Sequence, residues 1–250
     1  MTAIASDARF DMGRVVKRTL GAVGRNWAAF GILAFLFGVI PQGLLQSDRF
    51  GAFSGGARGL GLGFGLVLAA ASGSFILEGA LTFGVVADLD GRRPSVGECL
   101  SVGLRSIFPL LGLGVLMTMG IVLGLVLLIV PGVLMILAWI VAAPAMVVER
   151  TGIFEAFTRS SDLTRHHRGA ILVLVIAYWL LSVAISSAVD GLSSAAMGME
   201  NPPIWIRTAV AALVQGVQTL VGAAGAASIY FELRSIKEGV GPESLAAVFD

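Results

Sequence analysis

The sequence predicts an all-α, polytopic membrane protein: a bundle of six transmembrane helices in three hairpins, each hairpin preceded by a short cytoplasmic interfacial helix. Three observations lead to this fold class. Hydrophobic residues make up 56% of the 250 residues and charged residues only 13%, whereas charged residues make up roughly 25% of an ordinary soluble domain. The apolar residues fall in blocks of about 20, the length with which a helix crosses a bilayer. Most basic residues lie near one set of block ends.

The apolar blocks are interpreted as helices because a backbone inside a bilayer must satisfy its own hydrogen bonds. The alternating segments of about 10 residues that a transmembrane β-barrel requires are missing from the sequence. The six blocks cover residues 27–45, 60–87, 107–129, 132–148, 169–189 and 204–230. We therefore expect one integral membrane domain over 1–250, with a cytoplasmic amphipathic segment at 1–26, the six-span bundle at 27–230 and a cytoplasmic tail at 231–250.

The basic residues predict the orientation. Fourteen of the 17 lie on the side of the N-terminus, the segments 90–105 and 150–168 and the C-terminal tail, and three lie on the other side: Arg49, Arg58 and Arg207. The positive-inside rule then places both termini in the cytoplasm. Arginine outnumbers lysine and alanine and glycine are abundant, as in GC-rich bacterial genomes, so the expected location is the bacterial inner membrane. The charges of the first 25 residues do not fit a cleavable signal peptide.

A cytoplasmic segment with helical periodicity precedes each hairpin. The first segment has an apolar stripe and an opposite basic face, as expected for a helix lying in the headgroup region, where basic side chains reach lipid phosphates. The stripe contains Val16, Leu20, Val23 and Trp27, and the basic face contains Arg14, Lys17, Arg18 and Arg25. Membrane lipids are therefore expected partners, while a protein partner or a homo-oligomer stays open.

The second and third cytoplasmic segments carry helix signals. Ser95 and Glu98 form an S-x-x-E capping box, which predicts a helix start. In the third segment, Glu155 precedes Arg159 by four residues and Asp162 precedes His166 by the same spacing. Such pairs stabilise each other on one helix face, so a bound ligand is not needed to explain these charges.

Glu78 lies inside the second span, about ten residues and therefore roughly 15 Å from Asp88 at its cytoplasmic end. A carboxylate at this depth is costly unless it is paired or protonated, and such residues often mark ion or substrate pathways. Two interpretations follow: a protonated or hydrogen-bonded carboxyl group inside the bundle, which we favour, and a transport site.

Pro131 and Gly132 separate the third and fourth apolar blocks without any charge between them. Proline and glycine break helices, so we expect a tight turn that closes a hairpin at the outer face. The alternative is a broken helix whose exposed backbone coordinates an ion, as in transporters.

Catalytic and cofactor motifs are not recognisable. The single cysteine, Cys99, excludes a cysteine metal cluster, and the adjacent His166 and His167 do not have metal-ligand spacing on a helix. A glycine row at Gly59, Gly61, Gly63 and Gly65 suggests close helix packing. The net charge of +1 argues against a nucleic-acid partner. No cofactor or metal is therefore expected.

Several residues together resemble a known family. They are the segment Asp88–Ser95, then Val130-Pro131-Gly132, Trp139, Pro144 and Glu149, then Glu155-Ala156, Arg159-Ser160 and Leu163-Thr164, and finally Tyr230, Leu233-Arg234, Lys237 and Glu238-Gly239. This pattern, which covers about 80 to 240, resembles the membrane domain beside the catalytic barrel of some glycerophosphoryl diester phosphodiesterases, and related free-standing bacterial membrane proteins of unknown function. In the fused members the chemistry is expected in the soluble barrel, which has no counterpart here, so the resemblance implies no catalytic residue for this chain.

Our leading hypothesis is an integral inner-membrane protein that acts as a non-enzymatic structural or accessory domain. The alternative is a small transporter or lipid-handling protein that uses Glu78. A membrane enzyme would have to build its site from six cytoplasmic residues: Asp88, Asp90, Glu149, Asp162, His166 and His167.

Overall fold

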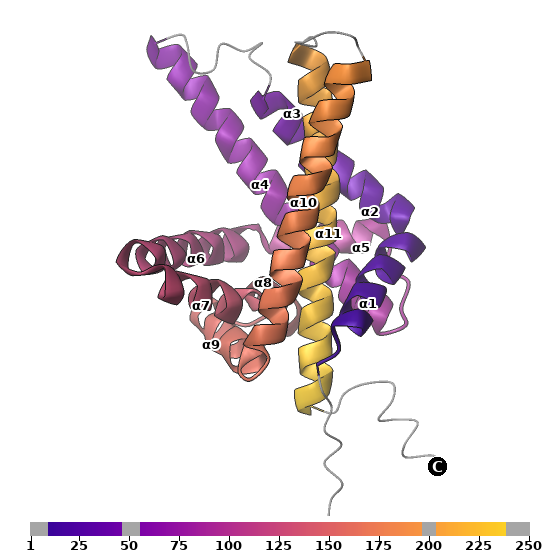
Figure 1. Ribbon diagram of the computed structural model, residues 1–250, viewed down its shortest axis with the longest axis vertical. Helices are drawn as coiled ribbons and strands as arrows, with labels where there is room; N and C mark the ends of the chain where they lie inside the picture. Colours follow the sequence, from indigo (N-terminus) through magenta and orange to yellow (C-terminus); the bar gives the residue numbers. More distant parts are fainter. Residues whose placement is uncertain (1–9, 47–55, 197–203, 239–250) are drawn as a thin grey trace, which may run out of the picture.

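The computed structural model describes residues 10–46, 56–196 and 204–238, and within these ranges the chain is helical and has no strand (Figure 1). The elements are α1 (Met12–Arg25), α2 (Trp27–Ala34), the π-helix η1 (Phe35–Val39), α3 (Ile40–Gln46), α4 (Gly56–Leu89), α5 (Val96–Arg105), α6 (Ile107–Leu127), α7 (Ile129–Trp139), α8 (Ala142–Glu149), α9 (Ile153–Thr164), α10 (Arg168–Ala196) and α11 (Ile204–Glu238). The all-α class predicted from the sequence is confirmed.

Six helical stretches in the described ranges are long and apolar enough to cross a membrane. They are Trp27–Leu45, Gly63–Leu89, Ile107–Leu127, Ile129–Glu149, Arg168–Leu192 and Ile206–Glu238, which confirms the predicted number of spans. The last helix continues eight residues beyond the predicted limit at 230. It continues because Phe231, Glu232 and Leu233 remain buried against the rest of the protein.

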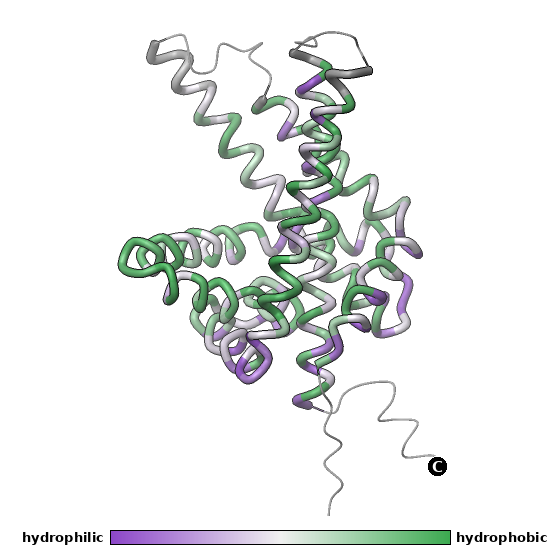
Figure 2. Tube along the Cα trace, in the orientation of Figure 1, coloured by the Kyte–Doolittle hydropathy of each residue, from purple (hydrophilic) through white to green (hydrophobic). Residues whose placement is uncertain are grey.

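The predicted three-fold organisation is present, with α1, α5 and α9 each leading into a helical hairpin. The hairpins are α2–α4, α6–α8 and α10–α11. Figure 1 shows α10 and α11 side by side along the long axis, α4 inclined to them, and α6 and α7 extending to one side. In Figure 2 the long helices are mainly hydrophobic, while hydrophilic residues gather around α1, α9 and the end of α11.

The first span contains a π-helical turn that the sequence analysis did not predict. In η1 the Ile40 N–H donates to the Phe35 carbonyl, one residue farther back than in an α-helix. Pro41 has no N–H to donate to the Phe37 carbonyl, which gives the helix a physical reason to widen here. The same carbonyl faces α4, where a Cβ on Gly73 would lie 2.8 Å from it. The irregular turn and the glycine thus let the two helices of the first hairpin approach closely.

The turn of the second hairpin lies at Leu128, three residues before the predicted break at Pro131 and Gly132, so that prediction was wrong. Leu128 is extended, with φ −163° and ψ 141°, and α7 begins at Ile129. Pro131 fits the first turn of α7, where a helix needs no N–H donor. A Cβ on Gly132 would lie 2.5 Å from the Leu125 Cγ, so this glycine permits close packing of α6 and α7.

The core lies where α1 and α5 pack on α4 and α11. Its largest fully buried side chains include Phe30, Leu77, Leu81 and Tyr230. Glycines make the close contacts here, since a Cβ on Gly103 of α5 would lie 2.5 Å from the Ile76 carbonyl oxygen of α4.

The predicted packing role of the glycine row is wrong for two of its members. A Cβ on Gly61 or Gly65 would meet nothing within 4 Å, and these residues are exposed. The side-chain surroundings of Gly59 are not among the described ones, and Gly63 is buried.

Candidate functional site

Ion pairs between helices form a layer at the end of the molecule where α1, α8, α9 and the end of α11 meet. We call it the ion-pair layer, and it consists of Arg14, Arg18, Arg25, Asp88, Glu149, Arg159, Glu232, Arg234 and Glu238. Nearly all of its links join different helices, and most join residues more than 60 positions apart in the sequence.

Glu232 on α11 is the most buried acid of the layer, with a side chain that is 0% exposed. The Arg18 guanidinium donates a hydrogen bond to its Oε2, and the Arg14 Nη1 lies 3.5 Å from its Oε1. Arg18 also lies over the Phe231 ring, 5.1 Å from the ring centroid, which adds a cation–π contact. A buried carboxylate is strongly destabilising without a cationic partner, so these two arginines hold α1 against α11.

Asp88 joins the end of α1 to the end of α4. Its side chain is 7% exposed and accepts hydrogen bonds from the Arg25 Nε at 3.2 Å and from the Asn26 Nδ2 at 2.7 Å. The hydrogen bond from Arg25 to Asp88 raises the pKa of the guanidinium. The junction between α1 and α2 is therefore fixed to the second span.

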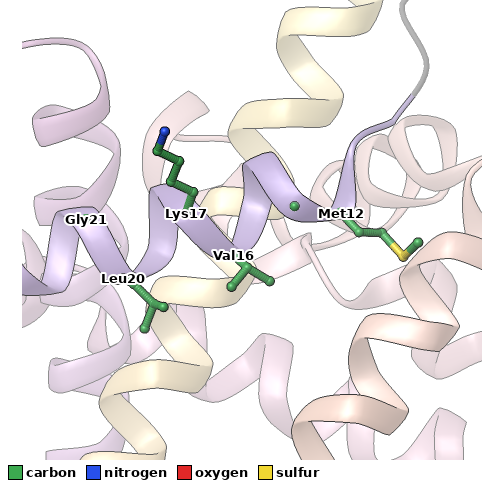
Figure 3. A pocket seen from close by; sticks show the side chains of 6 residues that line it. Met12, Val16, Lys17, Leu20 and Gly21 are labelled. Atoms are coloured by element: carbon green, nitrogen blue, oxygen red, sulfur yellow. The ribbon is translucent and has the colours of Figure 1, made fainter.

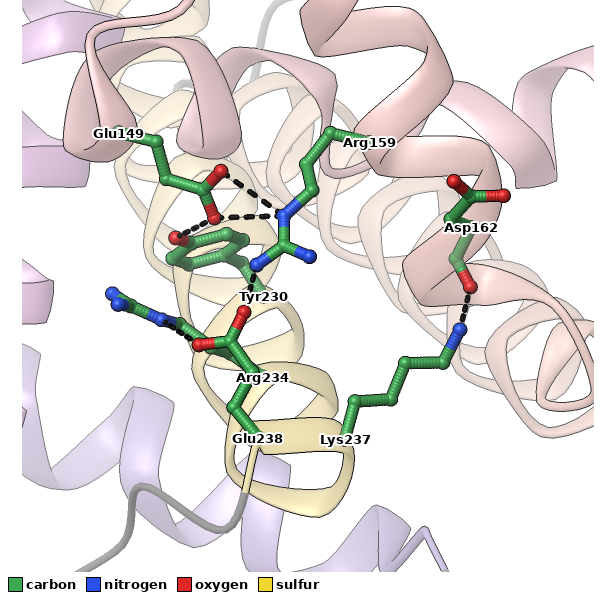
Figure 4. A network of polar contacts seen from close by, with 7 residues as sticks. All are labelled: Glu149, Arg159, Asp162, Tyr230, Arg234, Lys237 and Glu238. Carbon is green, nitrogen blue, oxygen red and sulfur yellow. Dashed lines mark hydrogen bonds and ion pairs between the residues drawn. The ribbon is translucent and has the colours of Figure 1, made fainter.

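Glu149 is the centre of a second cluster, which joins α8, α9 and α11 (Figure 4). The Arg159 Nε lies 3.0 Å from both carboxylate oxygens of Glu149, and the Tyr230 hydroxyl donates to the same carboxylate at 2.8 Å. Arg159 also donates to Glu238, which accepts a second hydrogen bond from the Arg234 Nε at 2.8 Å. Lys237 donates to the Asp162 carbonyl oxygen.

The predicted pairs within the third cytoplasmic segment were wrong. Glu155 caps α9 by accepting from the Gly152 N–H at 3.4 Å, and Arg159 reaches Glu149 and Glu238 instead. α9 ends at Thr164, so Asp162 and His166 are not one helical turn apart. His166 has a left-handed backbone with φ 75°.

The predicted capping box of α5 is confirmed. The Ser95 hydroxyl accepts from the Glu98 N–H at 3.2 Å, and Glu98 accepts from the Ser95 N–H at 2.9 Å. The hydrogen bonds that the Ser95 N–H and the Ser95 hydroxyl donate to the Glu98 carboxylate lower the pKa of this group.

The outward face of α1 is apolar. Met12, Val16 and Leu20 are 39%, 46% and 60% exposed, while the inward positions Val15, Thr19 and Ala22 are buried. Beside the outward row lies a shallow, open hollow whose lining residues all belong to α1, drawn in Figure 3. Of the four basic residues predicted at the headgroup region, Arg14, Arg18 and Arg25 belong to the ion-pair layer and Lys17 lines this hollow.

Glu78 is half-buried in α4, and within the described residues no hydrogen bond or ion pair to its carboxyl group is found. Thr82, one helical turn along the same face, is 0% exposed, and its hydroxyl oxygen has no hydrogen-bond partner among the described atoms. Neither the Glu78 carboxyl group nor the Thr82 hydroxyl thus has a partner among the described residues. Both interpretations of Glu78 stay open.

The six acids and histidines of the possible membrane enzyme are not brought together. Asp88 faces Arg25 and Asn26, whereas Glu149 belongs to the other cluster. In the part of the chain that the structure describes, no group of three or more His, Cys, Asp or Glu side chains is placed to hold a metal ion. His167 lies 5.8 Å from the Phe10 ring, and burial together with the charges of Lys237 and His166 lowers its pKa.

The contacts of Glu232 with Arg18 and of Tyr230 with Glu149 were not predicted from the sequence. The available signal was an acid in an otherwise apolar helix, with Ser228 and Ala224 one and two turns earlier on the same face. Such an acid needs a basic partner, and the basic face of residues 14–25 offered one. The sequence alone did not indicate that these two helices meet.

The fold and these clusters define the class: this is a multi-pass, α-helical integral membrane protein. A UPF0259 membrane protein from Pectobacterium carotovorum subsp. carotovorum (strain PC1) is 28% identical over 155 residues, which cover 62% of this chain and 58% of that protein. The chain thus spans less than two thirds of the length of this relative. The match supports a bacterial membrane protein. No family model matches the sequence, and no solved structure matches it. The resemblance to the phosphodiesterase membrane domain therefore stays an expectation from sequence.

Proposed function

We propose that this protein is a non-enzymatic structural or accessory module of the bacterial inner membrane, with both termini in the cytoplasm. The ion-pair layer is the observation that supports this proposal most. Its acids are held by arginines of the same chain, and its links fix the interfacial helices α1 and α9 to the long helices α4 and α11. A fixed cytoplasmic surface is what a partner or a lipid layer can recognise.

The same contacts argue against acid–base chemistry at these residues. A general base must reach the substrate proton with a free lone pair, within about 3 Å. Glu149 accepts from Arg159 on both oxygens and from Tyr230 on one, and Asp88 accepts from Arg25 and Asn26. The resemblance to a membrane domain that accompanies a separate catalytic barrel supports the same accessory role.

A reconstitution experiment combined with crosslinking tests this proposal. Purified protein in vesicles should neither hydrolyse phosphodiesters nor move solutes above the level of empty vesicles. In cells, photo-reactive residues at Phe154 of α9 and Trp27 of α2, which are 76% and 73% exposed, should give discrete adducts. Hydrolysis or solute flux that depends on this chain would overturn the proposal.

Glu78 supports a second candidate, a small transporter or lipid-handling protein. A half-buried carboxyl group without a partner in the described residues, beside the unpaired Thr82 hydroxyl, is a feature of ion and proton pathways. Proton or cation flux into vesicles should then be lost in Glu78→Gln. The matched control is Thr118→Val on α6, whose hydroxyl bonds only to its own helix at Gly114. Equal flux in both variants and in empty vesicles would sink this candidate.

A further inference from the structure

In α1 the larger apolar side chains lie on the outward side of the helix, whereas a helix that covers a protein core directs such side chains inward. Its small and buried positions, Val15, Thr19 and Ala22, face α4 and α11, while its larger apolar side chains face outward. Its arginines reach around to buried acids. The outward side of α1 is therefore built to contact something apolar that lies outside this chain.

The hollow on this side is shallow and open, and its lining comes from α1 alone. Met12, Val16 and Leu20 follow one another at intervals of four residues and form one row, and Gly13, Lys17 and Gly21 form the adjacent row. An added Cβ on Gly13 would lie 3.3 Å from the Asp11 Oδ1, and one on Gly21 would lie 3.0 Å from the Arg25 Nη1, so these two charged side chains flank the row. Figure 3 shows Val16 and Leu20 directed to one side of the helix and Lys17 to another. An exposed apolar row and one exposed cation thus lie on adjacent sides of α1.

Lys17 is the charged residue on this side of α1. It is exposed, and no ion pair or hydrogen bond to its ammonium group is found within the described residues. The other basic side chains of α1 are engaged with Glu232 or Asp88. An uncommitted ammonium group beside a continuous apolar row complements a molecule with an anionic group next to a hydrocarbon chain.

We propose that the outward face of α1 binds an anionic phospholipid of the adjacent leaflet, with the lipid phosphate at Lys17 and an acyl chain along Met12, Val16 and Leu20. This inference rests on the proposed accessory function and names one partner for it. Charge complementarity favours a lipid over a protein helix, because α1 sits beside the first span and offers a single cation flanked by apolar surface.

Native mass spectrometry of the full chain in mild detergent tests the proposal, with phosphatidylglycerol, phosphatidylcholine or inorganic phosphate added in turn. The wild type should retain phosphatidylglycerol in preference to phosphatidylcholine, and inorganic phosphate should not displace it. Lys17→Gln should reduce this retention about fivefold, the effect of roughly one basic charge near an anionic surface. Val16→Gln, which keeps the charge, should reduce retention of both lipids.

Two matched controls separate this site from general effects. Arg93→Gln removes one exposed positive charge, and Leu104→Gln removes one exposed apolar side chain from α5. Neither should change retention, and all variants should unfold at the wild-type temperature. Equal retention in Lys17→Gln and Arg93→Gln, or displacement of the lipid by phosphate alone, would overturn the proposal. None of these results would bear on solute flux or hydrolysis, which test the proposed function separately.

Discussion

At the scale of single residues, buried charge determines how the short helices α1 and α9 are held. Glu232 is fully buried, and its two cationic partners come from α1, more than 200 positions away in the sequence. Burying one carboxylate with its partners contributes little net stability, but removing one partner leaves an uncompensated buried charge. Substitutions here should therefore be far more damaging than those of exposed basic residues such as Arg93.

Arg18→Met should lower the free energy of unfolding by about 3 kcal/mol, because the Arg14 contact alone does not compensate the Glu232 charge. Denaturation of the purified protein in mild detergent would measure this. Adding Glu232→Gln to Arg18→Met removes the stranded charge and should restore part of the loss, which a double-mutant cycle quantifies. If the two single variants and the double variant all unfold like the wild type, the pair does not hold α1.

Cys99 should be inert to thiol reagents at neutral pH. It is buried in α5, and burial together with the Glu98 charge raises its pKa to about 11. Because the folded state binds the thiol proton more tightly than the unfolded state, this group contributes stability below about pH 9 that is lost as the pH rises toward 11. Maleimide labelling should therefore be slow at pH 7 without denaturant and complete with it. Rapid labelling of the native protein at pH 7 would contradict the described burial.

At the scale of elements, periodicity and block length predicted most helices correctly, while the turns depended on contacts that one sequence does not reveal. The capping box of α5 was found because its signal is local, with both partners three residues apart. The turn at Leu128 was missed because Pro131 is acceptable in the first turn of α7, so its helix-breaking effect does not operate there. The contact between Arg159 and Glu238 was missed because the two residues lie 79 positions apart in the sequence.

The α6–α7 packing gives a prediction at this scale. Gly132→Ala should destabilise the protein by about 1–3 kcal/mol, since its Cβ would lie 2.5 Å from the Leu125 Cγ. Pro131→Ala should change stability by less than about 0.5 kcal/mol, because a first-turn position needs no proline. Thermal unfolding in detergent measures both. Gly61→Ala, whose Cβ meets nothing within 4 Å, is the matched control, and a loss there as large as at Gly132 would mean that close packing is not the cause.

At the scale of the whole molecule, the three short helices α1, α5 and α9 and their hairpins form one body, and ion pairs join its parts at a single end. The ion-pair layer links the first and third units through α11, and the first hairpin is bound to α1 through Asp88. Sequence composition predicted that this end carries the charge. It could not predict which charges meet, because that depends on α1 and α9 both packing against α11. The apolar row of α1 is left facing outward as a result.

The orientation of this body in the membrane gives the last prediction. Gly97 in α5 and Gly191 near the end of α10 have open space around them, with nothing within 4 Å of an added Cβ, so a cysteine at either position should be tolerated. The positive-inside rule places Gly97 in the cytoplasm and Gly191 at the outer face. Because Cys99 is buried, the introduced thiol alone should react. A membrane-impermeant maleimide should label Gly191→Cys in spheroplasts and Gly97→Cys only after the membrane is opened. The reverse labelling pattern would mean that the protein has the opposite orientation in the membrane. The ion-pair layer and the outward face of α1 would then lie at the periplasmic surface.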